Sequence, residues 1–208
     1  MLKISPLRSS FVAIGAWNPA IIQPGWLREK FPQQVGDKKI PVHFTAGPAV
    51  ATMVMDLDKF LLDPNGGRLV FVPKVLDEET LREIQTLSKE IYRLLEHTPV
   101  SAAGSNFVFQ LDENEDFAIK ELLECTSSQQ IYDEIDLKKC IRRSVQHTFS
   151  FEDHNLNITM LKMESESTIQ LNYDYQSPID SMVKAADALI ENYRHALTVR
   201  DKLVRRVS

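Results

Sequence analysis

The stretch Thr168–Tyr175 constrains the fold most, because apolar and polar side chains alternate along it. Ile, Leu and Tyr occupy every second position, with Gln, Asn and Asp between them. This period of two predicts a strand with one buried and one open face. Two preceding stretches, Cys140–Phe151 and Leu156–Met163, are also typical of strands and are separated by short turns. Together the three predict an antiparallel meander.

Two amphipathic helices are predicted, one in each half of the chain. The first spans Asp77–Glu96, with Asp77 as a capping residue and acids in the first turn. The second begins at Ser177-Pro178 and runs to about Val204, since Ser favours the cap and Pro the first helical position. Lys and Arg near its end complement the helix dipole, an explanation preferred to nucleic-acid binding.

The first half also carries strand signals. Strands are predicted at Ser9–Trp17, at Val42–Leu57 with an interruption at Gly47-Pro48, and at Arg68–Val72. The intervening Asp63–Gly67 predicts a tight turn, because Asn-Gly and Gly-Gly supply the positive φ that such turns need. An antiparallel arrangement is therefore predicted here too.

The stretch Thr98–Leu111 is predicted to join two similar halves, 1–98 and 99–208, of one domain. It carries a turn signal at Ala103-Gly104-Ser105 and then a strand at Asn106–Leu111. The tetrad Ser9–Val12 resembles Ser105–Val108, and each opens a strand that is followed by further strands and one long helix. The expected fold is α+β, with two long amphipathic helices on one face of an antiparallel sheet and an internal duplication.

Composition excludes some classes of protein. The 208 residues are 43 % apolar and 25 % charged, which suits a folded domain rather than a disordered chain. A net charge of -5 argues against nucleic-acid binding, because neutralising a phosphate backbone needs a surplus of Lys and Arg. No apolar stretch approaches the roughly 18 residues of a membrane span, and the N-terminus lacks a signal-peptide pattern. A cytoplasmic protein is expected.

The two cysteines, Cys125 and Cys140, do not form a CxxC motif. Reduced thiols are the favoured interpretation, and a disulfide between them stays open. No phosphate-binding loop, zinc motif or nucleophile elbow occurs. The acids of Asp112–Asp116 are expected to cap a short helix, with metal binding as the alternative. The strand-sharing acids Asp56 and Asp58 are expected to be solvated. The sequence therefore predicts no catalytic residue, no cofactor and no metal.

Two features suggest a binding surface. The connection Asn18–Pro41 is long and carries aromatic residues, so we expect it to pack on the body or on a partner. The face of the meander away from the helices carries uncharged polar side chains, which suit a wet interface or ligand surface as well as an ordinary solvated face. The candidate binding residues are Trp17, Asn18, Trp26, Phe31, Asn106, Gln146, Thr148, Gln170 and Asn172.

Short motifs in Asn18–Trp26, Thr98–Val100, Gly104–Phe107 and Leu171–Tyr173 give the chain a family resemblance. It resembles an uncharacterised, sporadically distributed family of bacterial and phage-associated proteins. The likeness spans most of the chain, and Ser105 departs from it where the family has an apolar residue. The resemblance implies no activity, cofactor or site residue.

Two functional hypotheses of different classes follow. The first is a non-catalytic binding or assembly module, a homodimer or a partner-holding protein, that uses the open sheet face and the 18–41 connection. One version is a peptide-binding protein of the chaperone or antitoxin type. The second is an enzyme with a site at the junction of the halves, near Asn106 and His97. His147 is expected to be a hydrogen-bonded core residue on its strand.

Overall fold

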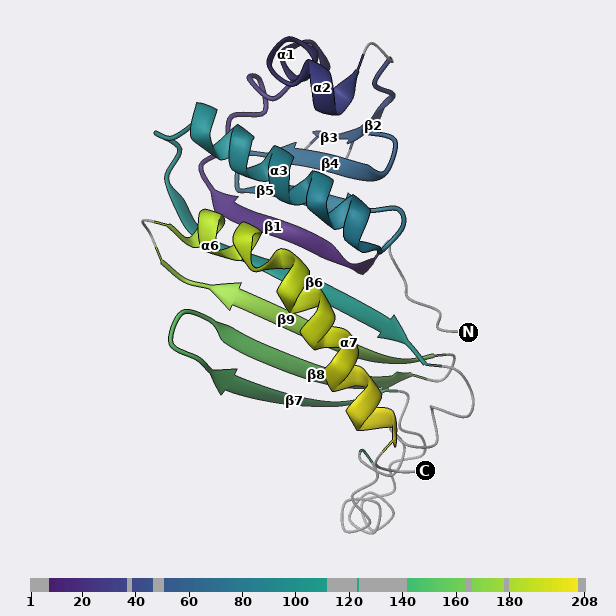
Figure 1. Cartoon of the computed structure of the whole chain (residues 1–208). Coiled ribbons are helices and arrows are strands. Elements are labelled where there is room, and N and C mark those ends of the chain that lie inside the picture. The colour runs from purple at the N-terminus through teal and green to yellow at the C-terminus, as the bar shows by residue number, and fades with distance from the viewer. Residues whose placement is uncertain are drawn as a thin grey trace.

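The computed structural model describes residues 8–36, 39–46, 51–111, 123, 142–163, 166–177 and 180–205. Its strands form one antiparallel sheet in the order β2-β3-β4-β5-β1-β6-β9-β8-β7 (Figure 1). The strands are β1 Ser10–Gly15, β2 Val42–Ala46, β3 Ala51–Asp56, β4 Phe60–Asn65, β5 Arg68–Pro73, β6 Val100–Gln110, β7 Arg142–Ser150, β8 Asn155–Met163 and β9 Ser167–Tyr175. The helices are α1 Pro24–Lys30, α2 Pro32–Val35, α3 Glu78–Leu94, α6 Ser181–Asp187 and α7 Leu189–Arg205.

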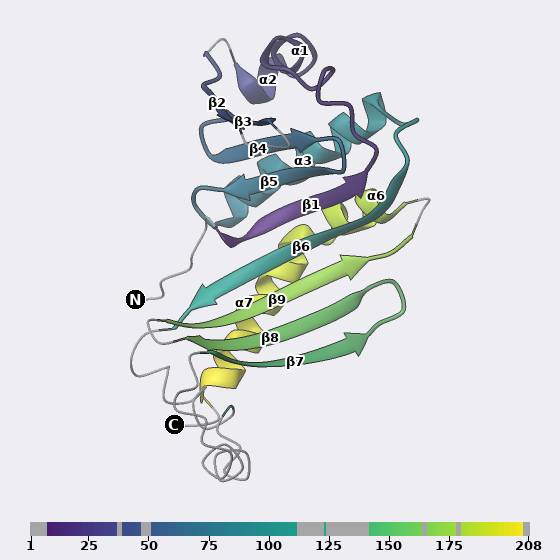
Figure 2. The same cartoon turned by 180° about the vertical axis from the view of Figure 1, so that it is seen from behind.

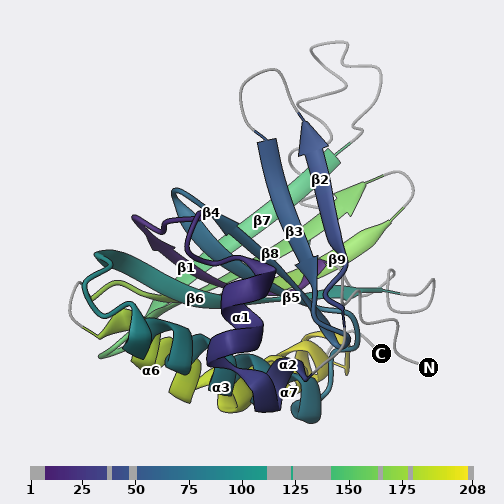
Figure 3. The ribbon, with the colours of Figure 1, turned by 90° about the horizontal axis from the view of Figure 1, so that it is seen from above.

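The long helices α3 and α6–α7 lie side by side on one face of the sheet. They stand in front of it in Figure 1 and behind it in Figure 2. Seen from above, β2 and β3 extend away from this helix layer (Figure 3). The predicted α+β class, with an antiparallel sheet and helices on one face, is confirmed.

The strand order is organised about one central pair. β1 and β6 pair antiparallel, with Val12 opposite Gly104. Outward from β1 lie the other strands of the first half, and outward from β6 lie those of the second. Each half therefore begins with a central strand and ends with a helix. The internal duplication stays a prediction, because a shared order of elements has more than one origin.

The core lies between the sheet and the helices. On β9 the side chains of Ile169, Leu171, Tyr173 and Tyr175 are at most 2 % exposed. The helix α3 buries the stripe that its sequence predicts, Leu81, Ile84, Leu87 and Ile91. Its cap is also as expected, because the Asp77 side chain accepts a hydrogen bond from the backbone N–H of Thr80 at 2.8 Å.

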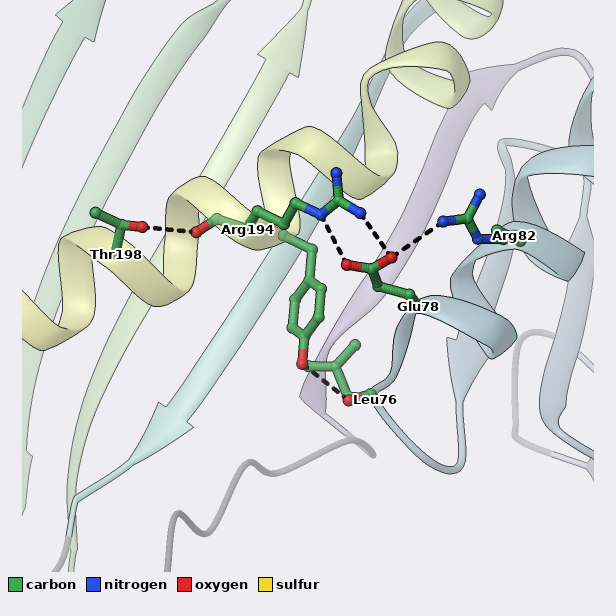
Figure 4. A network of polar contacts seen from close by, with 6 residues as sticks. Leu76, Glu78, Arg82, Arg194 and Thr198 are labelled. Carbon is green, nitrogen blue, oxygen red and sulfur yellow. Dashed lines mark hydrogen bonds and ion pairs between the residues drawn. The ribbon is translucent and has the colours of Figure 1, made fainter.

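Polar contacts fasten the helices of the two halves to each other (Figure 4). The guanidinium of Arg194 donates to both carboxylate oxygens of Glu78 at 2.7 Å, and Arg82 reaches the same carboxylate at 3.1 Å. This pairing with Arg194 lowers the pKa of Glu78. The Tyr193 hydroxyl donates to the Leu76 carbonyl at 3.0 Å. Helix α7 is thereby fixed to the start of α3.

Two predictions for residues 42–67 need correction, one for a strand and one for a turn, and one strand there was missed. Val42–Leu57 is not one long strand but the hairpin β2–β3, with Ala46 opposite Ala51 and Gly47-Pro48 outside the described residues. Strand β4 was not predicted, and it includes Asp63 and Pro64. The turn occupies Gly66 and Gly67 alone, because the Asn65 side chain accepts hydrogen bonds from the backbone N–H groups of Gly67 and Arg68.

The turn expected at Ala103-Gly104-Ser105 is also wrong, because all three residues lie within the continuous strand β6. Gly104 is required there for a different reason. A Cβ added to it would lie 2.4 Å from the carbonyl oxygen of Tyr173 on β9. This glycine allows two strands to approach closely and does not reverse the chain.

The C-terminal helix differs from its prediction in two ways. It is divided at Ala188 into α6 and α7, and α6 begins at Ser181 with Asp180 in the cap position. His147 is exposed on β7 and is not a core residue, because β7 is the last described strand of the sheet and the helices do not cover it. The short helix expected near Asp112–Asp116 lies outside the described residues, as do Cys125 and Cys140.

Candidate binding surface on the open sheet face

The strand register places five of the predicted binding residues together on one face of the sheet. This is the face opposite the helices, which is turned toward the viewer in Figure 2. Residues directly opposite each other on neighbouring antiparallel strands share a face, so the strand register defines rows of side chains. The two central rows run across the second half of the sheet. One is Thr148, Asn157, Asn172 and Asn106, and the other is Gln146, Thr159, Gln170 and Val108.

Hydrogen bonds connect the first of these rows. The Thr148 hydroxyl donates to the Asn157 side-chain oxygen at 2.7 Å. The Asn157 amide in turn donates to the Asn172 oxygen at 3.5 Å. The amide side chains are thus held in a line across β7, β8 and β9, and a bound group would meet a surface of oriented donors and acceptors.

Charged side chains are excluded from these rows. On the open face of β7, β8 and β9 the ionisable residues are Arg142 and Asp174, which lie in the outermost rows at opposite ends of the strands. The Asp174 carboxylate accepts a hydrogen bond from the Gln176 amide at 2.6 Å. An ordinary solvated sheet face carries Lys and Glu, whereas the inner part of a protein interface is depleted of charge.

A pocket of about 200 Å³ opens on the same face at the junction of the halves. The strands β1, β6 and β9 form it, and Gly104 leaves room in its floor. One side is polar and the other apolar. Its lining is Ser10, Val12, Ile14, Ala102, Ala103, Gly104, Asn106, Asn172 and Asp174.

Asn106 contributes an unsatisfied acceptor to this pocket. Its side-chain oxygen is buried and has no hydrogen-bond partner among the described residues. Buried acceptors in folded proteins are nearly always paired with a protein donor, a water or a ligand. Ile14, at the apolar side, is 49 % exposed. A partner that supplies an N–H donor beside an apolar group would satisfy both features.

The 18–41 connection packs on the body of the protein, which is one of its two expected positions, and two of the candidate binding residues in and beside it are buried. Trp17 and Phe31 are each 2 % exposed and belong to the core. The Trp17 indole donates to the Ala13 carbonyl at 2.9 Å. Trp26 is half-buried and packs edge-on against Phe31, with ring centroids 5.3 Å apart. The connection therefore packs on the body of the protein, and its buried rings are not available to a partner.

The other polar residues singled out in the sequence lie away from this surface. Asn18 is exposed, and its side chain accepts a hydrogen bond from the Ala20 backbone at 3.0 Å. The His97 side chain is 97 % exposed just beyond α3 and does not line the junction pocket. Asp56 and Asp58 do not share a strand as expected, because β3 ends at Asp56. Asp58 lies in the β3–β4 turn with φ 69°, and Asp56 pairs with Lys74.

A cluster of His and Tyr side chains on the helix face was not predicted from the sequence. The His154 ring stacks on Phe151 and Tyr175, with centroids 4.7 and 5.0 Å away. The hydroxyl of Tyr173 lies 2.8 Å from Nδ1 of His195. Burial raises the pKa of both tyrosines, and a hydrogen bond with His154 lowers the pKa of Asp153.

His195 was not identified from the sequence as a site residue, although its spacing from Asn192 indicates that it faces the sheet. It follows Asn192 by three residues on α7, and the buried Asn192 amide donates to the Ser105 and Tyr175 hydroxyls at 3.3 and 3.1 Å. A helix residue one turn from such an anchor faces the sheet. The pKa of His195 is lowered, first by burial and then by His154 and Lys202. This cluster connects α7 to β9.

A hollow of about 590 Å³ lies between α2, the β3–β4 turn and α3. Ion pairs already occupy its charged groups. Lys59 contacts Glu79 at 2.8 Å and also contacts Glu83, and Lys74 pairs with Asp56. Hydrogen bonds from Lys59 to both glutamates raise the pKa of that lysine. The hollow therefore offers few unused charged groups to a ligand.

No protein-family model matches the chain, and no curated protein is significantly similar to it. The family resemblance seen in the sequence therefore stays a prediction. Within the part of the chain that the structure describes, no three His, Cys, Asp or Glu side chains are grouped to hold a metal ion. The described helices also include none with the length and apolar character of a membrane span.

Proposed function

We propose that this chain is a non-catalytic binding module that holds a protein partner on the open face of β6, β9, β8 and β7. The observation that carries the proposal is the pair of charge-free rows, which end beside the buried, unpaired oxygen of Asn106. Uncharged amides beside an exposed apolar residue resemble the composition of an interface core. The 18–41 connection serves as a packed part of the body in this proposal.

The chemistry of the surface favours a polypeptide over other partners. Asn, Gln and Thr side chains offer both donors and acceptors, as backbone amides require. The apolar side of the junction pocket has room for one side chain of the partner. A phosphate-rich partner is disfavoured by the net charge of -5 and by the absence of cations in the central rows. The setting proposed for this complex is the cytoplasm.

Site-specific photocrosslinking tests the proposal. A photoreactive residue at Gln170, in the centre of the open face, should give a discrete adduct with a partner in the cells from which the chain comes. The same residue at Gln33, which is exposed on α2, is the matched control and should give none. Replacing Thr159 by Glu, which places a charge within the row that contains Gln170, should abolish the Gln170 adduct without unfolding the protein.

Two results would contradict the proposal. One is an adduct of equal yield from Gln33. The other is a Gln170 adduct that survives the introduced charge at Thr159 in full. Either would show that the charge-free rows do not select the partner.

An enzyme with its site at the junction is the second candidate, and the pocket beside Asn106 is the observation in its favour. Its lining contains a single ionisable side chain, Asp174, and His97 lies elsewhere. General acid–base chemistry requires a positioned proton donor or acceptor, so this candidate rests on Asp174 alone. Asp174→Asn should abolish any activity found in a substrate screen and leave partner crosslinking intact.

A further inference from the structure

The two strands at the ends of the described sheet differ in how they limit further pairing. Strand β2 has five residues and follows directly after Pro41. Strand β7 has nine residues that pair with β8 without a register shift, and it contains no Pro and no Lys. Natural sheets limit unwanted pairing by short edges, prolines, lysines and bulges. By these criteria β7 is an edge that is open to another strand.

The backbone groups on the outer side of β7 can be assigned from the hairpin. The N–H of Phe151 donates to the carbonyl of His154 at 2.8 Å, so it points toward β8. Because the direction alternates along an antiparallel strand, the backbone groups of Ser144, Gln146 and Thr148 point away from β8. Within the described sheet no strand accepts these outward groups.

The sequence of β7 is complementary to itself in the antiparallel direction. With a twofold axis at Gln146, Ser144 faces Thr148 of the partner subunit, and Val145 faces His147 of the partner subunit. The outward backbone groups of the facing residues then meet, and each such pair exchanges two hydrogen bonds. In this register no charged residue opposes a like charge. An axis at His147 would instead place each imidazole opposite its copy.

Side-chain chemistry supports the same register. Gln146 would meet the partner subunit's Gln146, and the polar rows of the open face would continue from one copy into the next. Arg142 and Arg143 each already take part in an interaction, so the proposed contact uses Ser144–Thr148. Phe149, 48 % exposed on the other face, would become covered near the axis.

We infer that two copies of this chain associate through antiparallel pairing of their β7 strands, centred on Gln146. The partner is a second copy and not a foreign strand, because the edge of β7 complements itself, as an isologous contact requires. Each dimer then has one sheet that runs through both copies. The inference is independent of the proposed partner on the open face, since it uses the backbone edge of β7.

Two substitutions at one position test this pairing by light scattering. Gln146→Pro removes an outward N–H and leaves the bonds to β8 intact, whereas Gln146→Ala keeps the N–H. Wild type and Gln146→Ala should have a solution mass of about twice the 23.8 kDa chain, and Gln146→Pro should have the mass of one chain. A single-chain mass for wild type up to its solubility limit would overturn the inference, and a dimeric, folded Gln146→Pro would do so too.

A disulfide test keeps the register falsifiable if the proline variant fails to fold. In a chain with Cys125→Ser and Cys140→Ser, Gln146→Cys should oxidise to a covalent dimer. The reason is that Cα atoms of a hydrogen-bonded antiparallel pair lie about 5.5 Å apart, within disulfide range. Ser150→Cys is the control, because the register places it opposite Arg142 of the partner subunit. Equal crosslinking at both positions, or none at Gln146→Cys, would reject the register.

Discussion

The two faces of strand β9 differ in what they contribute. The helix face is aromatic and aliphatic and is almost wholly buried, whereas the open face carries Gln170, Asn172 and Asp174, which are half-buried and polar. Burial of the first set supplies folding free energy in proportion to apolar area. The polar side chains of the open face add little folding free energy from apolar burial. These side chains can therefore be chosen for recognition, and the comparison predicts which substitutions affect stability and which affect binding.

The largest loss of stability is expected on the helix face. Leu171→Ala removes a fully buried side chain that packs against the core and should lower the free energy of unfolding by about 2–5 kcal/mol. Chemical denaturation measures it. If the loss were below about 1 kcal/mol, the cavity would have collapsed or the helix layer would pack more loosely than its burial indicates.

Gly104 should be an exception to this comparison, because a substitution at this open-face position is expected to lower stability. Gly104→Ala places a Cβ 2.4 Å from the Tyr173 carbonyl oxygen, so β6 and β9 must separate. A loss of about 1–3 kcal/mol is expected, which is typical of overpacking. Thermal unfolding of this variant, with Ala102→Ser as a control on the same strand and face, measures the effect. A Gly104→Ala protein as stable as wild type would show that the strands can shift at no cost.

The dependence of stability on pH should come from the helix face. The pKa of His195 in the folded state is below its ordinary value of 6.5, so the unfolded chain binds the proton more readily. Stability is therefore complete above pH 6.5 and falls as the pH drops through the folded pKa. His195→Asn should reduce this slope in denaturation curves recorded between pH 7 and 5. The depressed pKa of Asp153 acts separately, at pH values below 3.8.

The smallest effect on stability is expected in the central row of the open face. Asn172→Ala removes one amide that accepts a long hydrogen bond from Asn157. It should change the free energy of unfolding by no more than about 0.5 kcal/mol, as for most surface substitutions. The same variant should weaken the Gln170 photocrosslink. A large stability loss with unchanged crosslinking would reverse the comparison between the two faces.

Patterns formed by neighbouring residues predicted elements correctly in both halves of the chain. The alternation in Thr168–Tyr175 and the capped helix after Asp77 are each set by neighbouring residues, so they could be recognised directly. The hairpin β2–β3 and the strand β4 were missed because Pro48 and Pro64 suggest turns or interruptions. At Pro64 the strand continues, because Phe60 and Leu62 bury their side chains in the core.

The candidate site was predicted only in part, because local alternation can be recognised in a sequence and distant strand pairing cannot. Gln146, Thr148, Gln170 and Asn172 share the parity of their strands, so the sequence could place them on one face. The neighbourhood of Asn106 depends on the pairing of β6 with both β1 and β9, and residues so far apart in the chain give no local signal of it. Aromatic residues in the 18–41 connection looked available because composition does not show what covers a ring.

The position of β1 has a consequence for how the protein is made. It emerges first among the described strands, yet it ends between β5 and β6, with Phe11 opposite both Phe71 and Ser105. During synthesis it must wait for more than half of the chain before both of its edges are paired. Such distant pairing makes folding slow compared with helical domains. A ribosome that pauses after β5 would therefore hold a nascent chain whose central strand still has one edge exposed.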